Sequence, residues 1–151
     1  MPVAEAPMIA VDTNILVYAH RRDSPWHAQA SAVMRNLATG AAPWGIALHC
    51  LVEFYGIATH PKIYKTPTTP AKAADQIRAW TASPSLHILV ETGESVESIL
   101  NLCAKTKTVG SMVHDARVAA LCHDHGIDWL LTADRDFSRF AGVKTKNPLV
   151  A

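Results

Sequence analysis

Short apolar runs alternate along this chain with longer stretches in which apolar residues recur every three or four positions. The short runs predict buried β-strands, and the longer stretches predict amphipathic helices. We expect strands at residues 8–12, 44–48, 86–90 and 128–132, with a last edge strand at 142–145. We expect helices at residues 13–20, 24–38, 49–59, 70–82, 93–105 and 111–125, and a short helix at 133–140.

Capping residues support several of these helix ends. Ser24-Pro25 and Thr69-Pro70 each place a hydroxyl before a proline, which is typical of the first turn of a helix. Gly126 is placed to end the helix at 111–125. Residues 60–69 contain two prolines and several threonines and predict a loop.

Strands this apolar, alternating with helices, predict an α/β fold with a mainly parallel central sheet covered on both faces. The 151 residues suit one domain, which we place at 8–149 after a short flexible tail at 1–7. In such folds, ligands bind beyond the carboxyl ends of the strands. This directs attention to Asp12 and to residues 132–134.

Composition narrows the class of protein. Hydrophobic residues make up 49% of the chain and charged residues 18%, and no apolar run approaches the roughly 20 residues of a membrane helix. The beginning of the chain does not have the pattern of a secretory signal. The three cysteines are far apart, as expected for buried thiols in a reducing cytoplasm, so we expect a cytoplasmic protein.

The net charge of +1 does not point to a polyanionic partner, so any nucleic-acid contact must rely on local basic clusters. Each cluster alone is more often a solvated surface. Those near the acids described next are the candidates for holding RNA phosphates, with Arg135 and Arg139 first and Arg21 and Arg22 next.

Two acidic residues interrupt apolar surroundings in the first half of the chain. Asp12 is the only charged residue between Pro7 and Ala19, and it could either cap the next helix or serve a site. Glu53 shares a predicted helix side with Cys50 and Phe54, where a carboxylate is costly unless it is paired or bound to a metal.

The second half of the chain repeats this pattern. Asp115 lies on one helical stripe with Met112 and Ala119, although Arg117 or His114 could balance its charge at the surface. Asp134 and Asp136 follow the last buried strand, where acids can simply favour a helix start. Together, the five acids converge on the same end of the sheet.

Crowded carboxylates repel one another unless a cation compensates their charge. A ligand set made entirely of oxygen atoms suits Mg²⁺ or Mn²⁺, whereas zinc would need clustered His or Cys. His123-Asp124-His125 ends a helix, where positive charge is favoured, so we interpret these histidines as surface residues.

Four segments resemble those of the PIN-domain nucleases, and in particular the VapC-type toxins of bacterial toxin–antitoxin pairs. The resemblance covers residues 8 to 149, and the order and spacing of the segments carry it. The segments are Val11-Asp12-Thr13-Asn14-Ile15-Leu16, Leu51-Val52-Glu53-Phe54, His114-Asp115-Ala116-Arg117-Val118-Ala119-Ala120 and Thr132-Ala133-Asp134-Arg135-Asp136-Phe137.

The resemblance implies a three-layer α/β/α domain, Mg²⁺- or Mn²⁺-dependent RNA cleavage by an activated water, homodimerisation and inhibition by a small antitoxin. One departure is Leu48-His49-Cys50 ahead of Glu53, where many relatives place Ser or Thr. The site residues it implies are Asp12, Glu53, Asp115 and Asp134 as ligands, Asp136 as an auxiliary acid, and Asn14 and Thr132 as polar support.

Three other functions remain open on the sequence. The chain could be an RNA-processing nuclease that is not a toxin, a nucleic-acid-binding scaffold without chemistry, or a metal-dependent phosphatase of small molecules. A pure phosphate binder should avoid concentrated negative charge, which argues against the scaffold. Assays of RNA and of a small phosphate ester, with and without EDTA, separate these alternatives.

Overall fold

Five parallel strands form the sheet at the centre of this computed structural model, which describes residues 7–150. The predicted tail at 1–7 lies outside the described residues, except for the exposed Pro7. The sheet order is β3-β2-β1-β4-β5. The strands are β1 (Ile9–Val11), β2 (Trp44–Ala47), β3 (Leu86–Leu89), β4 (Trp129–Leu131) and β5 (Thr145–Lys146).

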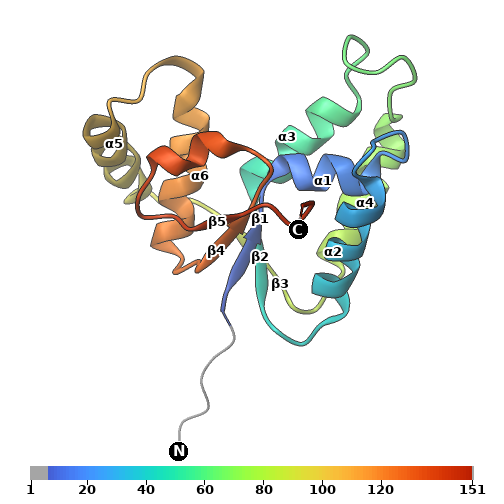
Figure 1. Cartoon of the computed structure of the whole chain (residues 1–151), viewed down its shortest axis with the longest axis horizontal. Helices are drawn as coiled ribbons and strands as arrows, with labels where there is room; N and C mark the ends of the chain where they lie inside the picture. Colours follow the sequence, from blue (N-terminus) through green and yellow to red (C-terminus); the bar gives the residue numbers. More distant parts are fainter. Residues whose placement is uncertain (1–6, 151) are drawn as a thin grey trace, which may run out of the picture.

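Within the described residues, six α-helices flank the sheet and confirm the predicted α/β/α class (Figure 1). They are α1 (Thr13–His20), α2 (His27–Thr39), α3 (Leu48–Ala58), α4 (Pro70–Thr81), α5 (Ser95–Thr106) and α6 (Val113–Asp124). Parallel strands are joined by right-handed crossovers, so the direction of each step along the sheet decides which face its helices cover. The connections from β1 to β2 and from β2 to β3 move in one direction along the sheet, whereas the connection from β3 to β4 moves in the other direction. Helices α1 to α4 therefore cover one face of the sheet, and α5 and α6 cover the other.

The contacts between helices follow this division. Helix α1 packs on α2 and α3, and α3 packs on α4, whereas α6 packs on α5. Figure 1 shows the two groups on either side of β1. Buried side chains of Trp44, Phe54 and Phe137 lie in one continuous core that joins them. None of the helices within residues 7–150 has the length and hydrophobicity that crossing a membrane requires.

Two predicted helix boundaries are wrong. The helix expected from 24 begins at His27, because Ser24 Oγ accepts a 3.1 Å hydrogen bond from the Trp26 amide and so forms a turn instead. The short helix expected at 133–140 is shorter than predicted and is a 3-10 helix, η2 (Arg135–Arg139). Phe137 within η2 and Phe140 directly after it are both buried in the core.

Other predicted ends moved by a few residues. The last strand is β5 at 145–146 instead of 142–145, and a 3-10 turn, η1 (Gly110–Met112), precedes α6. The Thr69-Pro70 prediction is confirmed, since Thr69 Oγ1 accepts from the Lys72 amide at 3.3 Å. Gly126 follows α6 with a φ of 66°, a conformation that glycine adopts without strain.

Candidate active site

The candidate site lies where β1 and β4 end. These neighbouring strands are followed by connections on opposite sides of the sheet, which opens a crevice at their carboxyl ends. Asp12 follows β1, and Thr132 and Asp134 follow β4. The amide of Asp12 donates a 2.9 Å hydrogen bond to the Leu131 carbonyl, so the two strand ends are joined at the site itself.

Asp12 is buried, and both of its carboxylate oxygens accept hydrogen bonds. Oδ1 accepts from the Thr13 amide at 2.8 Å, which makes Asp12 the cap of α1. Oδ2 accepts from the Thr132 hydroxyl at 2.8 Å. The capping role that the sequence left open is therefore confirmed, and the same side chain also borders the crevice.

Thr132 and Asn14 connect the two strand ends. Thr132 Oγ1 accepts from Asn14 Nδ2 at 3.1 Å and from the Asp134 amide at 3.0 Å. Asn14 Oδ1 accepts from the Ala133 amide at 3.1 Å. The backbone that carries Asp134 is thus fixed relative to Asp12.

Three further carboxylates come together at this point. One oxygen from each of Asp115, Asp134 and Asp136 lies within 4.8 Å of the other two. Asp134 Oδ1 also accepts from the Asp136 amide at 2.8 Å, which begins η2. Asp115 lies in the first turn of α6, which packs on η2.

Glu53 lies beside this triplet on α3. The expectation that it lies on the buried helix side is wrong, because 41% of its side-chain surface is exposed whereas Cys50 and Phe54 are buried. The helix turns Glu53 out of the core. Its negative charge acts on both Asp12 and Asp115.

Burial and mutual repulsion raise the pKa values of two of these acids. The pKa of Asp12 is raised by burial, although hydrogen bonds from Thr132 and Thr13 oppose the shift. Burial raises the pKa of Asp115 to about 6, with added contributions from the charges of Asp134, Asp12, Asp136 and Glu53.

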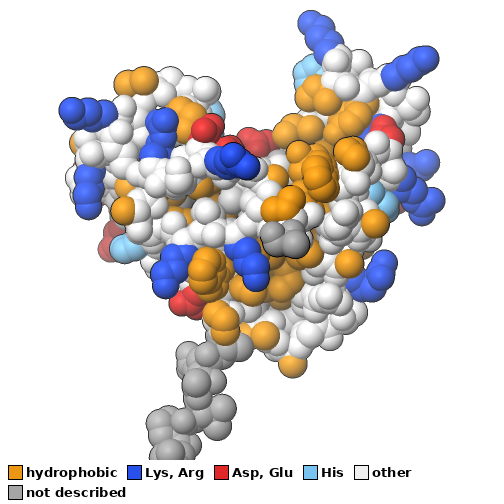
Figure 2. Space-filling model, in the orientation of Figure 1, with side chains coloured by type: hydrophobic (Ala, Val, Ile, Leu, Met, Phe, Trp, Pro, Cys, Tyr) orange, Lys and Arg blue, Asp and Glu red, His pale blue; other side chains and the backbone are white. Residues whose placement is uncertain are grey.

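The donor set fits a hard divalent cation. Every candidate ligand is a carboxylate, and several negative charges share a partly enclosed space in which repulsion already favours protonation. Such a cation would remove that repulsion. Figure 2 shows acidic side chains gathered in the hollow between the two raised parts of the molecule, with basic side chains beside them.

The four predicted RNA-binding arginines differ in their surroundings. Arg135 and Arg139 are exposed and form no ion pair within residues 7–150, and both belong to η2, next to Asp134 and Asp136. Arg22 is exposed and lines a hollow with Arg35 and Lys72, to which none of the five acids contributes.

Arg21 has contacts that the sequence did not predict. Its guanidinium binds Asp23 at 2.6 Å, donates to the Thr66 carbonyl at 2.9 Å, and lies 3.9 Å from the centre of the Tyr64 ring. It also donates to the Thr68 hydroxyl at 3.2 Å. Arg21 therefore ties the end of α1 to the loop before α4.

The sequence did not predict that three residues, His49, Arg117 and Glu91, form contacts beside Glu53. His49 Nε2 lies 3.7 Å from Glu53 Oε2, and Arg117 contacts both His49 and Glu91. The spacing of four residues between His49 and Glu53 was a usable signal for the first contact. Glu91 follows β3, and its approach to α6 depends on the tertiary fold.

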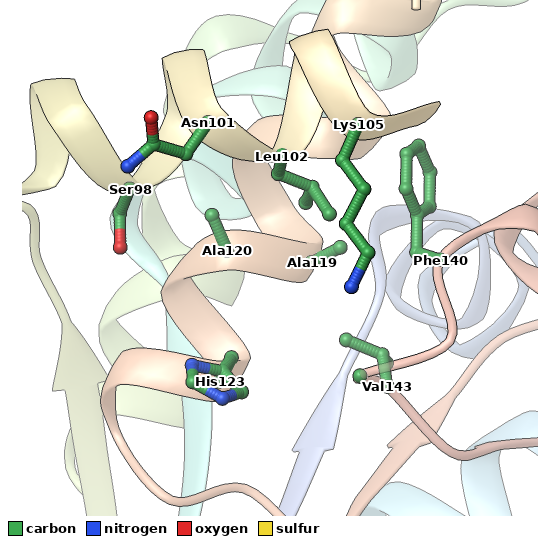
Figure 3. Close-up of a pocket in the computed structure, with 10 residues that line it drawn as sticks. Ser98, Asn101, Leu102, Lys105, Ala119, Ala120, His123, Phe140 and Val143 are labelled. Carbon is green, nitrogen blue, oxygen red and sulfur yellow. The ribbon is translucent and has the colours of Figure 1, made fainter. Parts of the chain in front are cut away.

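A cavity of about 290 Å³ lies apart from the acids, between α5, α6 and residues 140–143 (Figure 3). Leu102, Ala119 and Phe140 give it an apolar lining, and the side chain of Lys105 points toward it. None of the five candidate acids lines this cavity, so it is distinct from the candidate active site.

Comparison with known proteins identifies the family. The family model described as "PIN domain" matches residues 9–143. The chain belongs to the PIN-domain family. Similar curated proteins include "VapC ribonuclease Mb2897" of Mycobacterium bovis, 31% identical over 142 residues that cover 94% of this chain and 96% of the relative. "Ribonuclease VapC48" of Mycobacterium tuberculosis is 29% identical, with 91% of this chain and 94% of the relative covered.

Solved PIN-domain structures support the same fold. VapBC2 from Rickettsia felis, bound to a DNA fragment from its promoter, has a TM-score of 0.67 at 17% identity and covers 93% of this chain and 98% of its own. VapC20 of Mycobacterium tuberculosis, described as a Sarcin-Ricin loop cleaving toxin, has a TM-score of 0.64 at 20% identity, with coverages of 86% and 92%. At these identities the likeness concerns the fold alone.

Proposed function

We propose that this PIN-domain protein is a Mg²⁺- or Mn²⁺-dependent endoribonuclease that acts as the toxin of a toxin–antitoxin pair. The observation that carries the proposal is the group of three carboxylates at the crevice between β1 and β4, Asp115, Asp134 and Asp136, in which the pKa of Asp115 is raised to about 6 by burial and by the nearby charges, those of Asp12 and Glu53 included. The curated relatives at about 30% identity are named ribonucleases, which supports the same chemistry.

The five acids share one task in this proposal, and two polar side chains support them. Asp115, Asp134 and Asp136 form the closest group and would hold the cation together with Asp12 and Glu53. When bound, such a cation lowers the pKa of a coordinated water and neutralises charge on the phosphate. Thr132 and Asn14 keep the Asp12 carboxylate and the Asp134 backbone in place.

RNA would enter over η2. Arg135 and Arg139 project from this element without an ion pair in the described part of the chain, so they are free to hold phosphates that flank the cleaved bond. The water would attack in line, leaving a 5′-phosphate and a 3′-hydroxyl. Because water is the nucleophile, this reaction requires no nucleophilic side chain.

The proposed partners are an antitoxin and a second copy of this chain, in the cytoplasm. Structures with this fold include VapBC toxin–antitoxin complexes from Rickettsia felis and Salmonella typhimurium. Large apolar side chains are exposed around α5 and α6 and would be covered in such an assembly. They include Val96, Leu100, Val109 and Val113.

RNA cleavage assays with a matched variant test the activity. We expect purified protein to cut RNA with Mn²⁺ and to stop when EDTA is added, and we expect the Asp115→Asn variant to be inactive. Cleavage of a small phosphate ester but not RNA would indicate a phosphatase. A folded, Mn²⁺-loaded protein that binds RNA without cutting it would indicate a scaffold.

Expression in bacteria tests the toxin role. The wild-type chain should arrest growth, coexpression of its antitoxin should restore growth, and Asp115→Asn should be harmless. Active, folded protein that leaves growth unchanged would instead indicate an RNA-processing nuclease.

A further inference from the structure

Four side chains form a row that ends at Glu53. Arg117 Nε donates a 2.6 Å hydrogen bond to Glu91 Oε1, and Arg117 Nη1 lies 3.2 Å from His49 Nδ1. The other ring nitrogen of His49, Nε2, faces Glu53 Oε2 at 3.7 Å. The row crosses from the end of β3, through α6, to α3.

Arg117 determines which nitrogen of His49 carries the proton. A guanidinium has only donors, so the 3.2 Å contact requires Nδ1 of His49 to accept. The neutral ring then carries its hydrogen on Nε2, the atom that faces the Glu53 carboxylate. Partial burial and the charge of Arg117 lower the pKa of His49, while Glu53 and Glu91 oppose this shift and His114 reinforces it.

The row also links the two groups of helices that form the site. Helix α3 packs on α1 and α4, while α6 packs on α5 and η2. The rings of His49 and His114 are stacked, with centres 5.8 Å apart and planes within 15°. His114 and Arg117 flank Asp115 in the sequence, so the same contacts that reach Glu53 also fix the helix that carries Asp115.

We propose that His49 is a positioning residue, and that the row of Glu91, Arg117 and His49 directs the Glu53 carboxylate toward the acid cluster. Glu53 is exposed on α3, so its side chain has several orientations available, and an N–H group beside it favours one of them. The inference rests on the proposed function, because it assigns a role relative to the cation.

Calorimetric titration of Mn²⁺ into EDTA-treated, desalted protein tests the inference without relying on RNA cleavage. In His49→Gln, the amide N–H₂ reaches the position of Nε2, whereas the shorter side chain of His49→Asn reaches only that of Nδ1. We expect His49→Gln to bind Mn²⁺ within about threefold of wild type, and His49→Asn about tenfold more weakly, as for other residues that orient ligands. His123→Asn, an exposed histidine on α6, is the control and should match wild type.

A double-variant cycle tests the row itself. Arg117→Met should weaken Mn²⁺ binding, and combining it with His49→Asn should weaken it no further, because both act through the same N–H group. For RNA cleavage, His49→Asn should lower kcat and leave KM unchanged. Thermal melts in EDTA establish that each variant is folded.

The outcomes separate this inference from the proposed function. Equal Mn²⁺ binding by wild type, His49→Gln and His49→Asn would overturn the positioning role and leave the nuclease proposal standing. Independent, additive effects of His49→Asn and Arg117→Met would overturn the row. A wild-type protein that binds no Mn²⁺ would overturn both proposals.

Discussion

The hydroxyl of Thr132 donates a 2.8 Å hydrogen bond to Oδ2 of Asp12, which lies 120 positions earlier in the chain. Oγ1 of Thr132 itself accepts from Asn14 Nδ2 and from the Asp134 amide. A hydroxyl can donate once and accept twice, so Thr132 uses its full capacity. One small side chain therefore holds the ends of β1 and β4 in register for the acids that follow them.

Replacing Thr132 by Val should destabilise the protein. The change keeps the shape but leaves a buried oxygen of Asp12 with only the longer, 3.4 Å contact to Asn14. We expect a loss of about 2 kcal/mol, typical of a buried charged acceptor that loses its donor. Urea unfolding measures this loss. Thr132→Ser keeps the hydroxyl and should lose less than half as much, and equal losses would mean that the hydroxyl is not responsible.

The catalytic acids should differ in their effect on stability. Glu53→Gln should reduce RNA cleavage by at least about a hundredfold and leave stability within about 0.5 kcal/mol, because its side chain is exposed. Asp12→Asn should abolish cleavage and also cost about 1 to 2 kcal/mol, since its amide N–H₂ would face the donating Thr132 hydroxyl. Cleavage assays and urea unfolding give both quantities. Wild-type cleavage by either variant would remove that residue from the site.

Asp134 and Asp136 can be ranked in the same assays. Asp134 is partly buried and caps η2, whereas Asp136 is exposed, so Asp134→Asn should reduce cleavage more than Asp136→Asn. The reverse order would mean that Asp136 is the principal ligand of the pair.

The sequence predicted the strands well because strand ends depend on local pattern. Apolar runs ending in Asp12 and Thr132 already indicate strand ends, and a parallel sheet brings such ends to one edge. The start of α2 and the 3-10 form of η2 could not be predicted, because a side-chain turn at Ser24 and the burial of two phenylalanines decide them. The row from Glu91 to His49 joins residues far apart in the chain, which periodicity does not relate.

Replacing Arg139 should weaken RNA binding, whereas replacing Arg21 should destabilise the protein. Arg139 is exposed on η2, so Arg139→Gln should raise KM for RNA about threefold to tenfold and leave stability unchanged. Arg21 has only 11% of its side chain exposed and binds Asp23, Thr66 and Thr68, so Arg21→Gln should cost about 1 to 2 kcal/mol instead. Steady-state cleavage and urea unfolding distinguish the two. A large KM effect of Arg21→Gln without loss of stability would assign it to RNA binding.

The metal-free protein should become less stable as pH rises through the range of the Asp115 titration. Its pKa is raised from the usual 3.8 to about 6 in the folded chain, so between these values the folded state holds more proton than the unfolded state. Stability from this group is therefore greatest below about pH 4 and is lost as pH approaches 6. Solvent screening limits the effect to about 1 kcal/mol, or about 2 to 4 °C in Tm. The Tm difference between wild type and Asp115→Asn, measured in EDTA from pH 4 to 7, isolates it, and a constant difference would contradict the assignment.

Cation binding should reverse the stability order of wild type and Asp115→Asn. At pH 7 without metal, the variant lacks one of the mutually repelling charges and should be more stable by about 1 kcal/mol. A cation at about 100 times its dissociation constant stabilises the protein that binds it by about 2.7 kcal/mol, and the variant gains much less because a ligand is missing. Thermal melts of both proteins across a Mn²⁺ titration should therefore cross. The titration starts from metal-free protein in EDTA. Lys72→Met serves as a control that should follow wild type, because Lys72 lies on α4, away from the five acids. Parallel curves that do not respond to Mn²⁺ would mean that the five acids do not share one cation.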